Sequence, residues 1–346
     1  MRLPGLDGIR AISISLVLIY HLTASAGLKP WTFGAFGVEV FFVISGFLIT
    51  WLLIGEEAKR GWISLPSFYA RRALRILPPA MTYLAVVFIL SRFGVTRFTW
   101  VDAGACVFFV RNLVTGSNVT AHYWSLSVEE QFYLLWPLLM ILLGSNRTRL
   151  KVSAVLVLIA PLWRSINFRF WGSEFVNGWR FDLTYDGILM GCCLALLRND
   201  DRLSAYLRRG IFQSRWMPSA AIAGVIGSLT IPHARALAPL FVALFVNYAV
   251  DHSTDWGVVL NWGPMVWVGK LSYSLYIWQQ ILCYEHGLGW LTRFPQNLGA
   301  TVLLASLSYY LIEQPFADLR KHVPSFPNPG VFARLQPRTE VAIASD

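Results

Sequence analysis

The stretch "LDGIRAISISLVLIYHL", residues 6 to 22, is an apolar run with an arginine near its start and a histidine near its end. Small residues follow in "TASAG", as they do after a cleavable signal peptide. At about 100° per residue, a separation of eleven residues brings His21 to within about 20° of Arg10 around a helix. The two side chains share one face, roughly 16 Å apart along the axis. We therefore interpret the run as a retained membrane helix and expect the mature chain to begin at or near Met1.

The composition of the chain is typical of an integral membrane protein. Of its 346 residues, 55% are hydrophobic and only 14% are charged, and the mean hydropathy is +0.52. A soluble protein of this length needs more charge to cover its surface. The net charge of +10 comes mostly from loops between apolar runs, which favours a positive-inside membrane topology over nucleic-acid binding. The cysteines lie in apolar segments without metal-ligand spacing, so we expect no metal site and no disulfide framework.

Apolar runs recur along the chain at intervals that suit membrane helices joined by short loops. Ten candidate spans lie at 8–26, 34–54, 79–95, 126–144, 150–170, 183–198, 216–232, 236–251, 270–291 and 296–314. No internal repeat is evident, which weakens a transporter interpretation, because many transporters are built from duplicated halves. The sequence predicts one membrane domain over 1–320 and a polar, unstructured cytoplasmic tail over 321–346.

A weaker run, 100–114, carries Asp102 and Arg111 and decides the topology. The basic segments to be placed are 59–75, 147–151, 208–215 and 319–321. If the weak run does not cross the membrane, all of these segments fall on the cytoplasmic side. The sequence therefore predicts an all-α polytopic bundle of about ten transmembrane helices with both termini in the cytoplasm. The weak run becomes a re-entrant or interfacial segment on the outer side, buried by protein.

Charged residues inside membrane spans are costly and usually face the protein interior or a polar cavity. Asp7, three residues before Arg10, is placed to pair with it. The second span, "FGVEVFFVISGFLITWLLI" (36–54), carries Glu39 near its outer end and Ser45-Gly46 in its middle. For this serine and glycine, close helix packing is a more common role than ligand contact.

A basic cluster precedes the third span in "FYARRALRILPP" (68–79). Arg71, Arg72 and Arg75 lie on neighbouring turns, and we expect the two prolines that follow to break the helix before the span begins. Such clusters set topology or bind anionic lipids. They also bind phosphorylated ligands, because planar guanidinium groups engage phosphate oxygens in pairs. Both interpretations stay open.

Further acidic residues enter or leave the membrane in two other segments. In "HYWSLSVEEQFYLLWP" (122–137), Glu129 and Glu130 lie in the first turns of a helix, where acidic groups suit the helix dipole. Capping explains one of them, so we expect the other to pair with a buried cation such as Arg10 or to bond a neighbouring helix. Glu313 closes the last span on the cytoplasmic side, as a boundary carboxylate or as a partner of Arg72 and Arg75.

Together these segments resemble the acyltransferase-3 family of integral-membrane O-acyltransferases. The matching pieces occur in the family's order and are "LDGIRAISISLVLIYH", "FGVEVFFVISGFLIT", "FYARRALRILPP", "YWSLSVEEQFYLLWP", "KLSYSLYIWQ" and "SYYLIEQP". The resemblance implies transfer of an acyl group, commonly acetyl from acetyl-CoA, to a hydroxyl of a carbohydrate or related secreted molecule. It implies a catalytic role for His21 with Arg10 and the late acid Glu313, and acyl-CoA binding by Arg72 and Arg75. We expect the phosphates of acyl-CoA to lie near Arg72, Arg75 and Arg10.

On this basis we expect a multi-pass enzyme of the bacterial plasma membrane, whose partners are acyl-CoA, a glycosylated acceptor and membrane lipids. His21 would act as general base on the acceptor hydroxyl or take the acyl group itself. The alternative is a transporter or flippase of a polar lipid-linked glycan, in which the same charges would line a path. Some family members carry a fused extracytoplasmic esterase-like domain, which is not found in this sequence. Any second transfer step would then need a separate protein.

Overall fold

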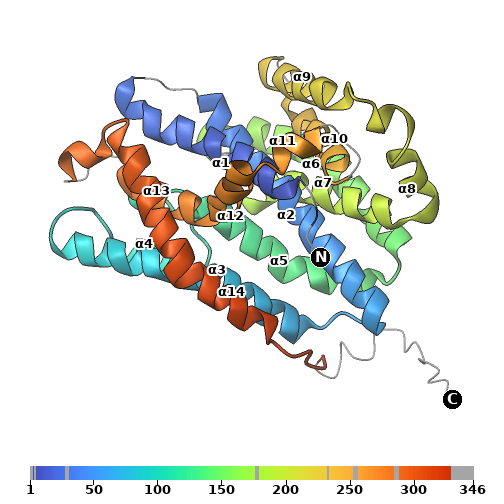
Figure 1. Ribbon diagram of the computed structural model, residues 1–346, viewed down its shortest axis with the longest axis horizontal. Coiled ribbons are helices and arrows are strands. Elements are labelled where there is room, and N and C mark those ends of the chain that lie inside the picture. Colours follow the sequence, from blue (N-terminus) through green and yellow to red (C-terminus); the bar gives the residue numbers. More distant parts are fainter. Residues whose placement is uncertain are drawn as a thin grey trace.

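The computed structural model describes Leu3 and residues 5–27, 31–175, 179–231, 234–251, 256–283 and 288–328. Within these residues the regular secondary structure is entirely helical, which confirms the predicted all-α class (Figure 1). The longer helices are α1 (Leu6–Leu22), α2 (Trp31–Arg60), α3 (Leu65–Arg92), α5 (Tyr123–Leu143), α6 (Asn146–Phe175), α7 (Phe181–Asn199), α9 (Met217–Thr230), α10 (Ala238–Ala249), α12 (Gly263–Trp278) and α13 (Gln296–Ser308). Each of them overlaps one of the ten predicted spans.

Short elements connect and extend these helices. They are α4 (Trp100–Val107), α8 (Asp201–Leu207), α11 (Trp256–Leu260) and α14 (Gln314–Lys321), the 3-10 turns η1 (Thr23–Ala26), η2 (Asn118–Thr120), η3 (Gly210–Gln213), η4 (Ala234–Leu237), η5 (Gln279–Leu282) and η6 (Gly289–Thr292), and the π-helical turn η7 (Tyr309–Glu313). The turn η7 joins α13 to α14, so these three elements form one long rod along the bundle (Figure 1).

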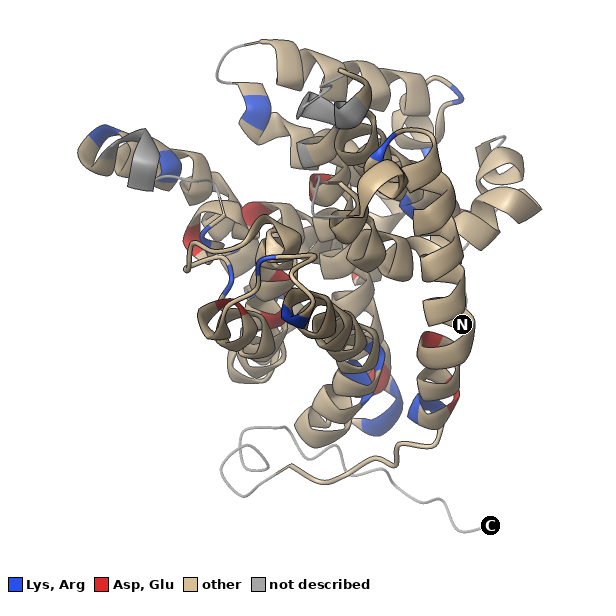
Figure 2. Cartoon of the chain, turned by 90° about the vertical axis from the view of Figure 1, so that its left-hand side faces the viewer, with Lys and Arg blue, Asp and Glu red and all other residues tan. Residues whose placement is uncertain are grey.

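Four of the described helices are long and apolar enough to cross a membrane: α2 over Phe36–Arg60, α3, α5, and α6 over Asn146–Trp171. Figure 2 shows long uncharged stretches of helix, with many of the charged residues near helix ends and in connections. The chain is therefore a helical membrane protein. The other predicted spans coincide with shorter or more polar helices, and the count of ten spans stays a prediction.

Only the first part of the weak run 100–114 is helical. It forms α4, which has eight residues. At 1.5 Å per residue it extends about 12 Å, less than half of the roughly 30 Å hydrocarbon core. Thr99 caps its start, and the carboxylate of Asp102 accepts the backbone N–H of Ser117 at 2.7 Å. Trp100 is 81% exposed. The helix is thus too short to span by itself, and it presents an apolar side chain outward.

Helix α3 corrects one expectation from the sequence. The prolines Pro78 and Pro79 do not break the chain before the span, because α3 runs without interruption from Leu65 to Arg92. Nearby hydroxyls supplement the backbone bonding in this region: Thr82 donates to the carbonyl of Pro78 at 2.9 Å, and Tyr273 of α12 donates to that of Ile76 at 2.8 Å. Proline is more frequent in membrane helices than in soluble ones, and α3 contains both prolines within its length. The basic cluster therefore lies on the same helix as the apolar span and not in a loop before it.

Helices α2 and α7 pack with their backbones in close contact. A Cβ atom built on Gly46 of α2 would overlap the carbonyl of Ile188, and one built on Gly191 of α7 would overlap that of Val43. Small residues allow such close approach between membrane helices. Gly46 therefore has the packing role that its sequence context favoured, and this contact fixes the positions of Ser45 and Glu39 on the same helix.

We expect Gly46→Leu to destabilise the protein by about 1–3 kcal/mol, because the new side chain must push the α7 backbone away. The measurement is the midpoint of thermal unfolding of purified protein in detergent. Gly55→Leu is the matched control on the same helix, because a Cβ atom at Gly55 meets nothing within 4 Å. Equal midpoints for the two variants would contradict this packing argument.

The beginning of the predicted tail lies against the start of α3. Ser67 donates to the carbonyl of Pro324 at 2.8 Å and accepts the N–H of Phe326 at 2.7 Å, while the amide of Asn328 accepts the N–H of Leu65 at 2.8 Å. This part of 321–346, up to Asn328, thus has specific contacts where the sequence predicted no structure. Residues 329–346 lie outside the described part of the chain.

Candidate active site

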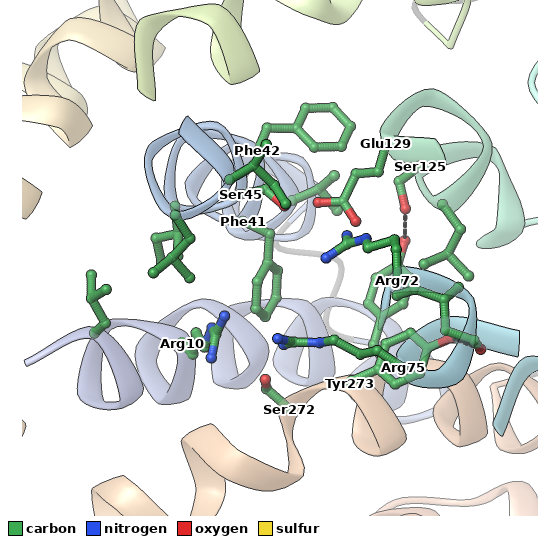
Figure 3. A pocket seen from close by; sticks show the side chains of 18 of the residues that line it. Arg10, Phe41, Phe42, Ser45, Arg72, Arg75, Ser125, Glu129, Ser272 and Tyr273 are labelled. Atoms are coloured by element: carbon green, nitrogen blue, oxygen red, sulfur yellow. Dashed lines mark hydrogen bonds between the residues drawn. The ribbon is translucent and has the colours of Figure 1, made fainter. Parts of the chain in front are cut away.

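A cavity of about 420 Å³ lies among α1, α2, α3, α5, α12 and α14 (Figure 3). Six of the ten residues singled out from the sequence line it: Asp7, Arg10, Ser45, Arg72, Arg75 and Glu129. They come from four different helices, α1, α2, α3 and α5. The tertiary structure therefore gathers most of the predicted polar residues into one site.

Three guanidinium groups extend into this cavity, those of Arg10, Arg72 and Arg75 (Figure 3). Arg10 forms the predicted ion pair with Asp7, at 3.6 Å. Arg75 forms no hydrogen bond and no ion pair with any described residue. Its charge still interacts electrostatically with those of Arg10 and Glu313 from a greater distance. Arg75 is therefore the guanidinium best placed to receive an anionic ligand.

Arg72 is held in place from two sides. Its Nε lies 3.5 Å from a carboxylate oxygen of Glu130, and its guanidinium carbon lies 3.5 Å from the ring centroid of Tyr133. The hydroxyl of Tyr133 in turn bonds Ser45. The cation that pairs with a glutamate of α5 is thus Arg72 and not Arg10, the example that the sequence suggested. The two helices that carry this pair meet only in the folded chain.

Arg320 of α14 adds a fourth positive charge to the lining of the cavity. Its burial and the nearby guanidinium groups of Arg75 and Arg72 lower the pKa of Arg320 below its ordinary value. This crowding of like charges favours binding of an anion, because a negative group there relieves the repulsion. Arg71 belongs to the same sequence cluster but does not line the cavity, and it pairs with Glu56 at 2.9 Å.

Glu313 lies at the end of the π-helical turn η7, a kind of irregularity that is frequent at functional sites. Its carboxylate accepts a hydrogen bond from the hydroxyl of Ser274 at 3.0 Å. One interpretation of the sequence was that Glu313 pairs with Arg72 and Arg75. Within the described chain it forms no ion pair with either arginine. The charges of Arg75 and Arg10 nevertheless act on it, so Glu313 lies beside the basic cavity without lining it.

His21 lies in the last turn of α1, outside the lining of this cavity. Its Nδ1 lies 3.1 Å from the carbonyl of Val17. A carbonyl oxygen only accepts hydrogen bonds, so in the neutral ring Nδ1 carries the proton and Nε2 keeps its lone pair. This tautomer suits a base or a nucleophile. Ser125 and Tyr276 line the basic cavity, and their hydroxyls lie 2.5 Å apart.

Two further buried polar residues, Gln279 and His122, lie near His21. The side-chain amide of Gln279 lies beside the imidazole of His21. Neither its nitrogen nor its oxygen has a hydrogen-bond partner of normal geometry among the described residues. His122 lies close enough to interact electrostatically with His21, and its two ring nitrogens are also unpartnered in the described chain. Unsatisfied buried polar groups are rare and often mark functional sites. In the sequence, the signal for these two residues is a polar side chain within an otherwise apolar segment, His122 in "HYW" and Gln279 in "IWQQ".

The described residues contain no group of three or more histidine, cysteine or acidic side chains arranged to hold a metal ion. The last predicted candidate, Glu39, lines a second cavity that also borders α2, together with Arg164 and Asp186. The site residues therefore divide between a basic cavity, the end of α1 and this second cavity.

Comparisons with known proteins point to acyl transfer. The family model for the acyltransferase domain of the acyltransferase-3 family matches residues 3–312. A protein named as a putative O-acetyltransferase in Staphylococcus aureus (strain COL) is 30% identical over 91% of this chain and 57% of its own length. The peptidoglycan O-acetyltransferase OatA of Listeria monocytogenes is 27% identical over 90% of this chain and 55% of its own length. The chain thus spans about half the length of the curated relatives it matches, and no solved structure matches it.

Proposed function

The chain belongs to the acyltransferase-3 family, and from this premise we propose that it is a membrane O-acetyltransferase. It would move an acetyl group from cytoplasmic acetyl-CoA to a hydroxyl of a carbohydrate of the cell envelope. The observation that carries the proposal is the convergence of Arg10, Arg72 and Arg75 on one cavity, with His21 on the same helix as the first of these arginines.

The basic cavity suits the donor. Coenzyme A carries several phosphate charges, and guanidinium groups bind phosphate oxygens through short charge-assisted hydrogen bonds. Arg75 has no other partner among the described residues, and in the predicted topology it lies towards the cytoplasm, where coenzyme A is found. The pantetheine arm would then extend along the cavity towards Ser125 and Tyr276. The roughly 16 Å from Arg10 to His21 along α1 is of the order that this arm covers.

His21 would carry out the proton transfer. Its Nε2 lone pair accepts the proton of the acceptor hydroxyl while the hydroxyl oxygen attacks the thioester carbon. The C–S bond then breaks, and the coenzyme A thiolate leaves and takes up the proton. In the alternative mechanism, Nε2 attacks the thioester carbon, the C–S bond breaks and the coenzyme A thiolate leaves. The acceptor hydroxyl then attacks the acetyl-imidazole, the N–C bond breaks, and the proton of the hydroxyl passes to the thiolate. Both mechanisms use the tautomer that the Val17 carbonyl favours.

The acceptor and the location are proposed from the relatives and the predicted topology. With ten spans and both termini in the cytoplasm of a bacterial plasma membrane, the end of α1 that carries His21 lies towards the outer side. The name of the Listeria relative favours peptidoglycan or a related glycan as the acceptor. A flippase of a lipid-linked glycan remains the second candidate, and it has only the buried charges in its favour.

The proposal is tested by incubating membranes that contain the protein with acetyl-CoA labelled in its acetyl group, and by following the label into glycan and lipid fractions. We expect label in the glycan fraction, released by mild alkali as expected of an O-acetyl ester. Membranes without the protein are the control. Glycan translocation without transfer of label would favour the flippase and would contradict the proposed enzyme.

A further inference from the structure

The second cavity has a volume of about 650 Å³ and lies among α2, α5, α6, α7 and the turn η4. This volume is within the range of roughly 300–1,000 Å³ that is usual for small-molecule sites. The residues that matter below are Glu39, Trp124, Arg164, Trp179, Asp186 and Arg235. Apart from Glu39, they take no part in the function proposed above.

One wall of this cavity is aromatic. The indole rings of Trp124 and Trp179 are stacked, with centroids 5.9 Å apart and planes inclined by 12°. Phe42 meets Trp124 edge-on at 6.0 Å. Trp179 is 42% exposed, so part of its ring stays open to a ligand. A flat apolar surface beside polar groups suits a sugar ring, which presents C–H groups on its faces and hydroxyls around its edge.

The polar groups of the cavity carry balanced charge. Arg164 and Asp186 form a two-point ion pair at 2.5 and 3.3 Å, with Asp186 buried. Glu39 and Arg235 add one acid and one base. Carboxylates accept and guanidinium groups donate hydrogen bonds, so together they serve hydroxyls in both directions. Two acids and two bases favour a neutral polyhydroxyl ligand over a phosphate or a lipid tail, in contrast to the four arginines that line the first cavity.

The position of the cavity also fits an acceptor. In the predicted topology, Glu39, Trp124, Arg164 and Asp186 all lie towards the outer ends of their spans. The first cavity contains Arg72 and Arg75, which lie towards the cytoplasmic side. The two cavities share Val38 and Phe42. They therefore approach the same part of α2 from opposite sides of the membrane.

We propose that the second cavity is the acceptor subsite, which binds a sugar unit of the glycan against Trp179 and Trp124 with Glu39 and the Arg164–Asp186 pair on its hydroxyls. The inference rests on the proposed function. A sugar held there lies next to Phe42, which separates it from the donor cavity. The aromatic pair selects a carbohydrate, and the balanced charges select an uncharged segment of it.

The test measures binding of the neutral oligosaccharide chitopentaose to the purified full chain by calorimetry, in a zwitterionic detergent that has no sugar headgroup. We expect saturable binding to the unmodified protein and at least about tenfold weaker binding to Trp179→Ala and to Glu39→Gln. Trp216→Ala is the matched control, because Trp216 is 66% exposed and lines neither cavity. It should bind within twofold of the unmodified protein. The midpoint of thermal unfolding checks that each variant is folded.

Absence of saturable binding to the unmodified protein, or unchanged binding by both cavity variants, would overturn the inference. Displacement of the sugar by phosphatidylglycerol would overturn it in favour of a lipid site. The proposed function fails separately: sugar binding without any transfer of acetyl label would contradict the enzyme but not the subsite. Acetyl transfer with an acceptor KM unchanged in Trp179→Ala would contradict the subsite alone.

Discussion

Replacing His21 with alanine should lower the rate of acetyl transfer by about 10²- to 10⁴-fold, the usual contribution of a general acid–base residue. At this end of α1 the imidazole Nε2 carries the lone pair that can accept a proton, because Nδ1 donates its hydrogen to the Val17 carbonyl. The measurement is the initial rate of label transfer from acetyl-CoA to glycan in purified protein. His21→Gln should be similarly inactive, since a carboxamide keeps a hydrogen-bonding group but is not a base.

Binding of acetyl-CoA separates loss of chemistry from loss of folding in these variants. The arginines of the basic cavity are untouched, so the Kd for acetyl-CoA should change by less than about threefold. His322→Ala is the matched control, because His322 is exposed directly after the end of α14 and its ring lies within hydrogen-bond distance of the backbone carbonyl of Asp318. Its rate should equal that of the unmodified protein. A His21→Ala variant that keeps more than a tenth of the activity would contradict the mechanism.

Replacing Arg75 with alanine should raise the KM for acetyl-CoA about 10- to 100-fold. Hydrogen bonds to charged groups contribute about 1.5–3 kcal/mol, and each 1.4 kcal/mol is a factor of ten in affinity. Arg75 has no ion pair with a described residue, so its loss removes the ligand contact without leaving an acid unpaired. Steady-state kinetics with acetyl-CoA as the varied substrate measure the effect. Arg75→Lys should recover part of it, because an ammonium keeps the charge but not the two-point geometry.

Arg71→Ala is the control for this experiment. Arg71 lies four residues before Arg75 on the same helix, but it pairs with Glu56 and does not line the cavity. Glu56 keeps a second partner in Arg60, at 3.0 Å. The KM for acetyl-CoA should therefore stay within about twofold of the unmodified value. If Arg71→Ala and Arg75→Ala had the same effect, general loss of positive charge at the membrane surface would explain the result better than a binding site.

Much of the helical architecture could be predicted from the sequence, because apolar runs and helix-compatible lengths are local properties. The prolines of α3 show where local reasoning failed. Propensity alone predicts a break at Pro78, but α3 continues through it, and Tyr273 of α12 donates a hydrogen bond to the carbonyl of Ile76. Tyr273 comes from a helix almost 200 residues further along the chain, and no local window contains it.

The sequence by itself determined that this is an all-helical membrane protein, and it supplied the arginines, the histidine and the acids of the site. These facts follow from residue identity and short-range periodicity, since burying charge in a membrane is costly enough to mark those residues. The tertiary structure decided which of them meet. It paired Glu130 with Arg72, left Arg75 without an ion pair to any described residue, and assembled the second cavity from five separate elements. Such pairings depend on which helix faces touch, and close contacts such as that at Gly46 fix this only once the chain has folded.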